Sequence, residues 1–103
     1  LRLTFAARHD LRLIHRHSEE VFGLKQADAY AAGLTRALRL IAEYPSAARL
    51  RTETARPVRA SPYRSHVIVY TFEEGDVLIL RIRHAGEDWL NDPPDSSPSE
   101  DYQ

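Results

Sequence analysis

Five histidines are the residues of this chain best suited to metal binding or acid–base chemistry, and three of them lie close together in the sequence. His9, His15 and His17 are separated by six residues and then by two. Side chains share a helix face when they are three or four residues apart, so neither spacing brings two imidazoles together. The chain has no cysteine that could add a thiolate ligand. We therefore predict no metal site in this segment.

The same segment contains the residue types of a hydrolytic triad, namely Asp10, His15 and Ser18. A single helix cannot converge three such groups on one reacting atom, and no Gly-x-Ser-x-Gly turn accompanies them. The four glycines are isolated, so the chain also lacks a glycine-rich phosphate loop. We interpret the three residues as solvated helix residues, and we expect no catalytic residue and no cofactor.

Thirteen of the 14 basic residues are arginine, and acids balance them unevenly along the chain. The net charge is −1, but the last 13 residues carry four acids and no base, which leaves a basic body. Arginine binds carboxylates and phosphates through paired hydrogen bonds, so this body suits an acidic partner. The arginines between Arg49 and Arg64 would also suit nucleic-acid phosphates. The near-zero net charge and the few interleaved aromatics favour an acidic protein segment or a plain solvated face.

The fold that positions the candidate residues is expected to form around a β-hairpin in the second half of the chain. The segments 66–72 and 77–84 are rich in β-branched and aromatic residues, and a short acidic stretch with one glycine separates them. The first segment is apolar on both faces, which is typical of a strand inside a sheet. In the second, strict alternation would place Leu78, Leu80 and Ile82 on one face and Val77, Ile79, Arg81 and Arg83 on the other.

Two helices precede the hairpin. A short strand is expected over 1–5, a first helix over 6–22 and a second over 25–44, with a left-handed cap at Gly23 and a stop at Pro45. We expect an irregular stretch over 47–60 and a short strand over 58–61 that Pro62 ends. The order β-α-α-β-β-β predicts an α+β fold in which a helical hairpin packs on a small, mostly antiparallel sheet.

The length of 103 residues fits one domain, which we place at residues 1–90. Residues 91–103 are acidic and rich in proline and serine, so we predict a flexible tail there. No apolar run is long enough to span a membrane, and no signal peptide is visible. Together with the absence of cysteine, this favours the cytoplasm.

Taken in order, these segments resemble the ParE branch of the RelE/ParE superfamily, the toxins of bacterial type II toxin–antitoxin pairs. The resemblance covers nearly all of 3–89. Its N-terminal part consists of Ala6-Ala7-x-x-Asp10-Leu11-x-x-Ile14, Ala27-x-x-Tyr30-x-x-x-Leu34 and Leu40-Ile41-Ala42-x-x-Pro45, followed by Arg49. The more specific part is Ser65-His66-Val67-Ile68-Val69-Tyr70 and Ile82-Arg83-His84-Ala85-Gly86-Glu87-Asp88-Trp89.

One position separates the two branches of this superfamily. In RelE-type nucleases, which cut mRNA on the ribosome, the strand similar to His66–Tyr70 carries an arginine that stabilises charge at the cleaved phosphate. Val67 occupies that position here, and the loss of such a donor lowers the rate by roughly 100- to 1,000-fold. Arg64 lies about 10 Å back along the expected strand, on its other face. The basic, tyrosine-bearing C-terminal segment of RelE is also missing.

The resemblance therefore implies a non-nucleolytic toxin that binds DNA gyrase and is neutralised by a cognate antitoxin, with no direct contact to nucleic acid. For contacts to the target or the antitoxin we predict Arg59, Arg64, Arg81, Arg83, His84 and Trp89. Each has a structural alternative, since the arginines could be solvated, His84 could hydrogen-bond within the fold and Trp89 could cover the core. Two other functions stay open: a ribosome-dependent nuclease that uses His66 and His84, and a toxin fold without toxicity.

Overall fold

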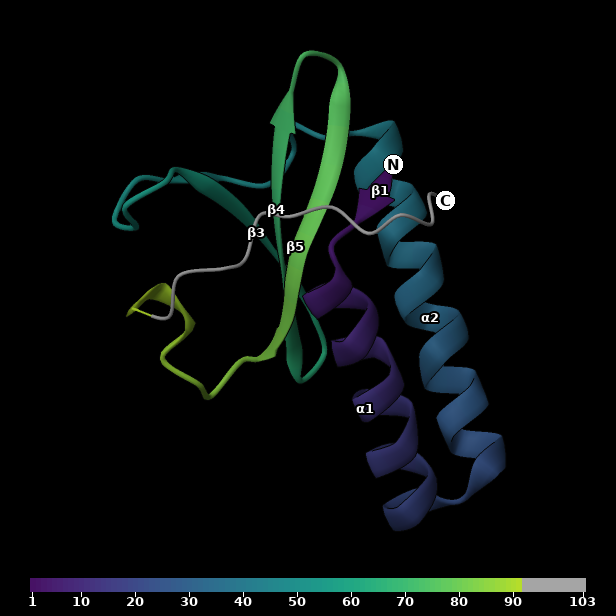
Figure 1. Ribbon diagram of the computed structural model, residues 1–103. Coiled ribbons are helices and arrows are strands. Elements are labelled where there is room, and N and C mark those ends of the chain that lie inside the picture. The colour runs from purple at the N-terminus through teal and green to yellow at the C-terminus, as the bar shows by residue number, and fades with distance from the viewer. Residues whose placement is uncertain (92–103) are drawn as a thin grey trace.

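In the computed structural model, which describes residues 1–91, a five-stranded sheet forms around the predicted hairpin (Figure 1). Strands β4 (His66–Glu73) and β5 (Asp76–His84) are antiparallel. Their turn residues, Glu74 and Gly75, have φ values of 55° and 76°. Two positive φ values in succession are what the tightest hairpin turn requires, which explains the glycine between the two apolar segments.

The remaining strands add to both sides of this hairpin. β3 (Val58–Tyr63) pairs antiparallel with β4, and the two-residue β2 (Leu50–Arg51) pairs with the start of β3. β1 (Arg2–Leu3) pairs parallel with β5, so the order across the sheet is β1-β5-β4-β3-β2. The predicted element order along the chain, β-α-α-β-β-β, is confirmed, with β2 as an additional strand in the stretch expected to be irregular.

Helices α1 (Phe5–Phe22) and α2 (Leu24–Glu43) form a hairpin that covers one face of the sheet and projects beyond it at the Gly23 end (Figure 1). Gly23 alone joins them, with φ 88° and ψ 166°. The predicted positive φ is correct, but ψ lies outside the left-handed helical region, because one residue must end α1 and begin α2. α1 starts one residue earlier than expected, since Thr4 caps it by accepting a hydrogen bond from the Ala7 N–H at 3.0 Å.

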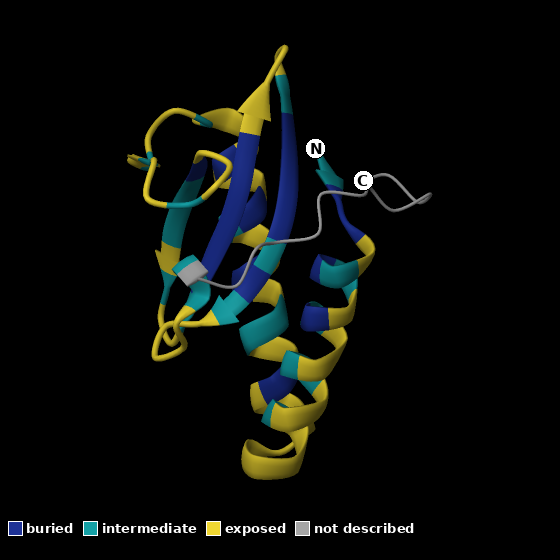
Figure 2. Cartoon of the chain, turned by 60° about the vertical axis from the view of Figure 1, so that its left-hand side comes forward, coloured by how far each residue is buried: buried dark blue, intermediate teal, exposed yellow. Residues whose placement is uncertain are grey.

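Both faces of the sheet are buried, as the dark strands of Figure 2 show. On the helix side, residues of β4 and β5 pack against the predicted apolar stripe of α2, in a cluster that includes Leu34, Leu38, Ile41, Ile68, Tyr70, Ile79 and Ile82. On the opposite side lies a smaller cluster, formed by Val58, Val67, Val69, Leu78 and Leu80 with Trp89 against it. The central position of β4 explains why this segment is apolar on both faces.

A β-bulge in β5 changes the predicted faces of that strand. Tyr70 lies opposite Ile79, but the preceding residue of β4, Val69, lies opposite Arg81, so Leu80 is the extra residue. Leu80 packs on the far side of the sheet, whereas Ile82 packs toward the helices. The prediction that these two residues share a face is therefore wrong, because the bulge resets the alternation.

The hairpin of β3 and β4 differs from the expectation at two residues. Pro62 lies within β3 and does not end it. β2 pairs only with Val58 and Arg59, so β3 is an edge strand at Pro62, where proline is tolerated. Arg64 lies in the two-residue turn before β4, with φ 52°, and not along the strand as expected.

α1 closes the outer edge of β5 beyond the short β1. The Thr4 N–H donates to the Ile79 carbonyl at 3.0 Å, and the Thr4 hydroxyl donates to the Leu80 carbonyl at 2.7 Å. Farther along, the Asp10 carboxylate accepts the Ile82 N–H at 2.9 Å. These three bonds satisfy backbone groups that an exposed edge would present to other chains.

Among residues 1–91, no helix has the length and the apolar run that crossing a membrane requires. The predicted tail, 91–103, falls outside the described residues except for Asn91, which ends the short 3-10 helix η1 (Trp89–Asn91).

Candidate functional site

A groove of about 740 Å³ lies between α2 and the free part of β3, and we call it the α2 groove. Leu40 and Tyr44 of α2 are 58% and 62% exposed at this groove. Its other wall is Ser61–Tyr63, and among residues 1–91 the strand β2 that pairs with this edge of β3 reaches only Val58 and Arg59. An apolar helix face beside an unpaired strand edge is a typical binding surface for a helix or strand of another protein.

Two of the predicted arginines lie near the α2 groove, but they have different roles. Arg64 lines the groove at the β3–β4 turn, where its guanidinium lies 5.8 Å from the Tyr63 ring centroid. Arg59 donates to the Ala48 carbonyl at 2.6 Å and thereby holds the loop that follows α2. The Tyr70 hydroxyl supports the same loop by donating to the Pro45 carbonyl at 2.7 Å. Arg59 therefore holds the loop that borders the groove, whereas the Arg64 side chain lines the groove itself.

Arg81 forms a two-pronged ion pair with Asp10, a residue that we interpreted as solvated. The Arg81 Nε and Nη2 atoms donate to the Asp10 carboxylate at 2.8 and 2.9 Å. Asp10 is only 8% exposed, so the interpretation of it as a solvated helix residue is wrong. Its carboxylate faces the sheet because it also accepts the Ile82 N–H. The structure thus shows a role for Arg81 within the fold.

Arg83 and His84 are bound to the loop that follows β5. Arg83 Nη2 donates to the Glu87 carboxylate at 2.5 Å, and the His84 N–H donates to the same carboxylate at 2.9 Å. The hydrogen bond from Arg83 lowers the pKa of Glu87. The Gly86 N–H donates to His84 Nδ1 at 3.1 Å, so a neutral His84 carries its proton on Nε2.

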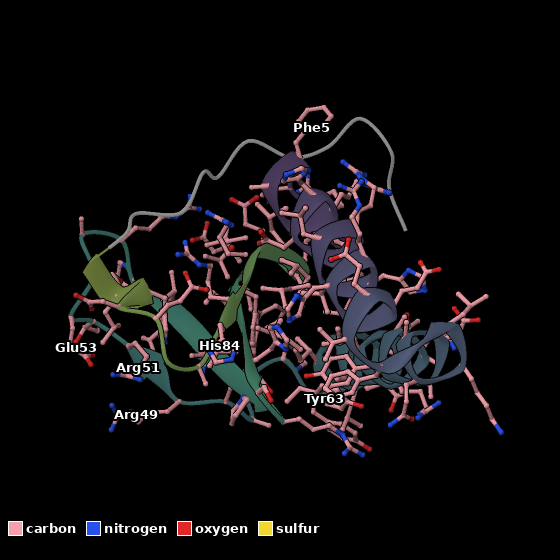
Figure 3. The ribbon with its side chains drawn as sticks, turned by 90° about the horizontal axis from the view of Figure 1, so that it is seen from below. Phe5, Arg49, Arg51, Glu53, Tyr63 and His84 are labelled. Carbon is pink, nitrogen blue, oxygen red and sulfur yellow. The ribbon has the colours of Figure 1, made fainter. Side chains whose placement is uncertain are left out.

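Trp89 lies against the far side of the sheet, away from the helices. The Arg51 guanidinium lies 5.6 Å from its ring centroid and is bound in turn by the Glu53 carboxylate at 2.6 Å. In Figure 3, Arg51 and Glu53 lie at the end of the molecule that is away from the helices. Trp89 therefore covers the smaller hydrophobic cluster on the far side of the sheet, which we call the second core.

Val67 lies on this same far side, with 9% of its surface exposed. It belongs to the cluster against which Trp89 packs. The position at which the resemblance places a nuclease arginine is therefore occupied by a core residue that cannot donate a hydrogen bond.

A cluster of aromatic and imidazole rings lies on the helix side, between α2, the β3–β4 turn and the end of β5. The Tyr30 hydroxyl lies 2.8 Å from His66 Nδ1, and the His66 ring lies edge-on to the His84 ring with centroids 5.6 Å apart. The Tyr30 and Tyr63 rings meet edge-on at 5.5 Å. We did not predict this cluster, because its members come from four different elements. Among residues 1–91, no three His, Cys, Asp or Glu side chains gather closely enough to hold a metal ion.

Burial, followed by the proximity of His84, lowers the pKa of His66 below its ordinary value, whereas Glu87 and Asp10 act weakly in the opposite direction. A histidine with a lowered folded-state pKa stabilises the fold fully above the unfolded value, about 6.5, and loses this contribution as the pH falls. We therefore expect His66→Gln to lower the free energy of unfolding less at pH 5.0 than at pH 7.5.

Urea unfolding at the two pH values measures this difference. His9→Gln, at an exposed helix position, is the matched control and should track the unmodified protein at both. Equal losses of stability at pH 5.0 and pH 7.5 for His66→Gln would contradict the assignment.

A solved chain from the chromosomal ParDE toxin–antitoxin system of P. aeruginosa is similar in fold, with a TM-score of 0.67 and 20% identity over 80% of this chain and 90% of that one. No curated protein sequence matches this chain significantly. The family model that describes the ParE toxin of the type II toxin–antitoxin system parDE matches residues 1–89. Because this match spans nearly all of the described residues, the chain belongs to the ParE toxin family.

Proposed function

We propose that this ParE toxin acts in the cytoplasm by binding DNA gyrase, without catalysis, and that a cognate antitoxin neutralises it by occupying the α2 groove. The proposal that the toxin acts without catalysis rests on the position of Val67. It is buried in the second core, where the related nucleases have an arginine for the phosphoryl transition state.

The experiment compares two activities of the purified toxin. We expect inhibition of supercoiling by gyrase and no cleavage of mRNA on translating ribosomes. Expression without an antitoxin should arrest growth and induce the response to DNA damage. Uninhibited supercoiling would contradict gyrase as the target, and normal growth would indicate a toxin fold that has lost its toxicity.

One observation favours the second candidate function, a ribosome-dependent nuclease. The rings of His66 and His84 lie 5.6 Å apart at the edge of a pocket, and two imidazoles at such a distance can act as acid and base on one phosphate. These rings face the helices, whereas Val67 faces the other side of the sheet. If mRNA is cut and His84→Ala abolishes the cutting, this function replaces the non-catalytic one.

The proposed antitoxin site combines apolar surface with positive charge. Leu40 and Tyr44 expose apolar side chains in the α2 groove, and Arg36 and Arg64 line it. Among the residues that line the groove in the described chain, none is acidic. An amphipathic acidic segment would bury its apolar side chains there and pair its carboxylates with the arginines.

We expect the substitution Leu40→Glu to weaken binding of the antitoxin encoded beside this toxin by at least about 10-fold, because it removes apolar contact and adds a like charge to the acidic partner. Calorimetric titration of the two purified proteins measures this change. Leu13→Glu makes the same exchange on α1 at a residue that is 43% exposed, and it should bind normally. Equal weakening by both substitutions would place the antitoxin elsewhere.

A further inference from the structure

A second cavity, of about 670 Å³, lies where the helical hairpin extends past the sheet, and we call it the hairpin-end pocket. Its walls come from the end of α1, from α2, from the β3–β4 turn and from the end of β5. The ring cluster of Tyr30, Tyr63, His66 and His84 belongs to these walls. A volume of this size falls within the range of pockets that hold small molecules, about 300–1,000 Å³.

The charge of the hairpin-end pocket is of one sign. Arg36 of α2 and Arg64 of the turn both line it, and no Asp or Glu does so among the described residues. Neither arginine forms an ion pair within residues 1–91. The nearby Glu87 carboxylate is bound by Arg83 and by the His84 N–H. Two arginines that approach from different elements suit a phosphate, which accepts hydrogen bonds from several directions.

The histidines of the pocket add further hydrogen-bonding groups. His84 Nδ1 accepts the Gly86 N–H, so a neutral His84 carries its proton on Nε2, and His66 Nδ1 is hydrogen-bonded to the Tyr30 hydroxyl. Burial lowers the pKa of His66, which keeps this ring neutral near pH 7. The pocket therefore combines two fixed cations with two imidazole side chains, of which His84 can donate through Nε2.

The opposite end of the pocket is aromatic. Phe22, the last residue of α1, lines the pocket and is 65% exposed. From Leu24 to Arg36 the axis of α2 advances by roughly 18 Å. Because the Phe22 and Arg36 side chains both extend from the backbone into the pocket, the distance between their ends is shorter than this axial span. A ligand with a ring at one end and a diphosphate at the other can therefore contact both.

We propose that the hairpin-end pocket binds a nucleoside diphosphate, with its phosphates between Arg36 and Arg64 and its base against Phe22. The proposal goes beyond gyrase inhibition, and the site shares Arg36 and Arg64 with the α2 groove, so a bound diphosphate and the antitoxin would compete for these two arginines.

Calorimetric titration of the purified toxin with ADP at fixed ionic strength tests the proposal. We expect saturable binding, at least 10-fold weaker binding of inorganic phosphate and of adenosine, and a loss of at least 10-fold for Arg36→Gln and for Arg64→Gln. Arg12→Gln removes the same charge from an exposed position of α1 outside this pocket and should bind ADP normally. Unfolding curves confirm that the variants fold, since all three arginines are exposed.

Several results would overturn the proposal. The first is an absence of ADP binding at millimolar concentration. The second is equal affinity for ADP and inorganic phosphate, which would indicate a simple anion site. The third is unchanged binding by Arg36→Gln and Arg64→Gln. A single-stranded oligonucleotide that binds more tightly than ADP and displaces it would show that the ligand is a nucleic-acid strand.

Discussion

The variant Asp10→Ala should lose about 3 kcal/mol of folding free energy, because breaking a buried ion pair leaves an uncompensated charge. Asp10 accepts two hydrogen bonds from Arg81 and one from the Ile82 N–H. The Arg81 side chain is 25% exposed, so water can solvate part of the charge that remains, and we use the lower end of the usual cost. Domains of this size are stable by only about 5–15 kcal/mol, so the expected loss is a large share of the total.

Chemical unfolding of three variants separates the two roles of Asp10. Asp10→Asn keeps an acceptor for the Ile82 N–H but removes the charge, so it should be less destabilised than Asp10→Ala. Asp28→Asn is the matched control, because Asp28 binds His15 at the surface with a side chain that is 65% exposed. An exposed pair of this kind contributes between 0 and about 1 kcal/mol. Equal losses for Asp10→Asn and Asp28→Asn would contradict the buried ion pair.

A double variant tests whether the cost comes from the partner that is left behind. In Asp10→Ala/Arg81→Met, no unpaired guanidinium remains, so part of the lost stability should return. If the losses of the two single variants simply add, the two side chains do not interact.

The elements of the fold could be predicted because their signals are local. The spacing of Leu34, Leu38 and Ile41 indicates a helix face, and all three are buried in the core beneath α2. The turn at Gly75 follows from a glycine between two apolar segments. These patterns depend on residues a few positions apart, so the sequence alone reveals them.

The register of the central hairpin could not be predicted in the same way. If strict alternation continued from the turn, His66 would lie opposite Arg83. The extra residue Leu80 shifts the pairing, so that His66 lies opposite His84. Nothing in the apolar pattern of β5 marks the bulge, because Leu80 is as apolar as the three residues before it. The contact between His66 and His84 in the ring cluster therefore follows from a single inserted residue.

The contacts between α1 and β5 could not be predicted from the sequence, for a different reason. Asp10 and Arg81 are 71 residues apart in the sequence, and each resembles an ordinary exposed helix or strand residue. Their pairing depends on the depth at which α1 lies against the edge of β5, which the Thr4 hydrogen bonds set. Tertiary placement of this kind leaves no periodic signal.

The lining of the candidate binding surface could not be predicted from the sequence. Tyr63 lines both the α2 groove and the hairpin-end pocket. Its position depends on Gly33, a buried residue in the middle of α2. A β-carbon added at Gly33 would lie 1.8 Å from the Tyr63 hydroxyl oxygen and 2.8 Å from its Cζ atom.

We therefore expect Gly33→Ala to destabilise the protein by about 1–3 kcal/mol, the usual cost of overpacking, although alanine favours helices over glycine by roughly 1 kcal/mol. Tyr63 cannot move away freely, because its ring meets that of Tyr30 at 5.5 Å and the Arg64 guanidinium lies over it. The sign should reverse when Tyr63 is removed. In the Tyr63→Ala background the clash is absent, so Gly33→Ala should be neutral or stabilising by up to about 1 kcal/mol.

Urea unfolding of the two single variants and the double variant measures this coupling. The coupling is the difference between the stability change that Gly33→Ala causes in the unmodified protein and the change that it causes in the Tyr63→Ala background. Ala32→Gly, at the adjacent exposed position of α2, calibrates the helix preference in this protein and should cost about 1 kcal/mol. If Gly33→Ala raises the free energy of unfolding of the unmodified protein by as much as Ala32→Gly lowers it, Tyr63 does not pack on Gly33. The shapes of both the α2 groove and the hairpin-end pocket depend on this contact, because Tyr63 lines each of them beside α2.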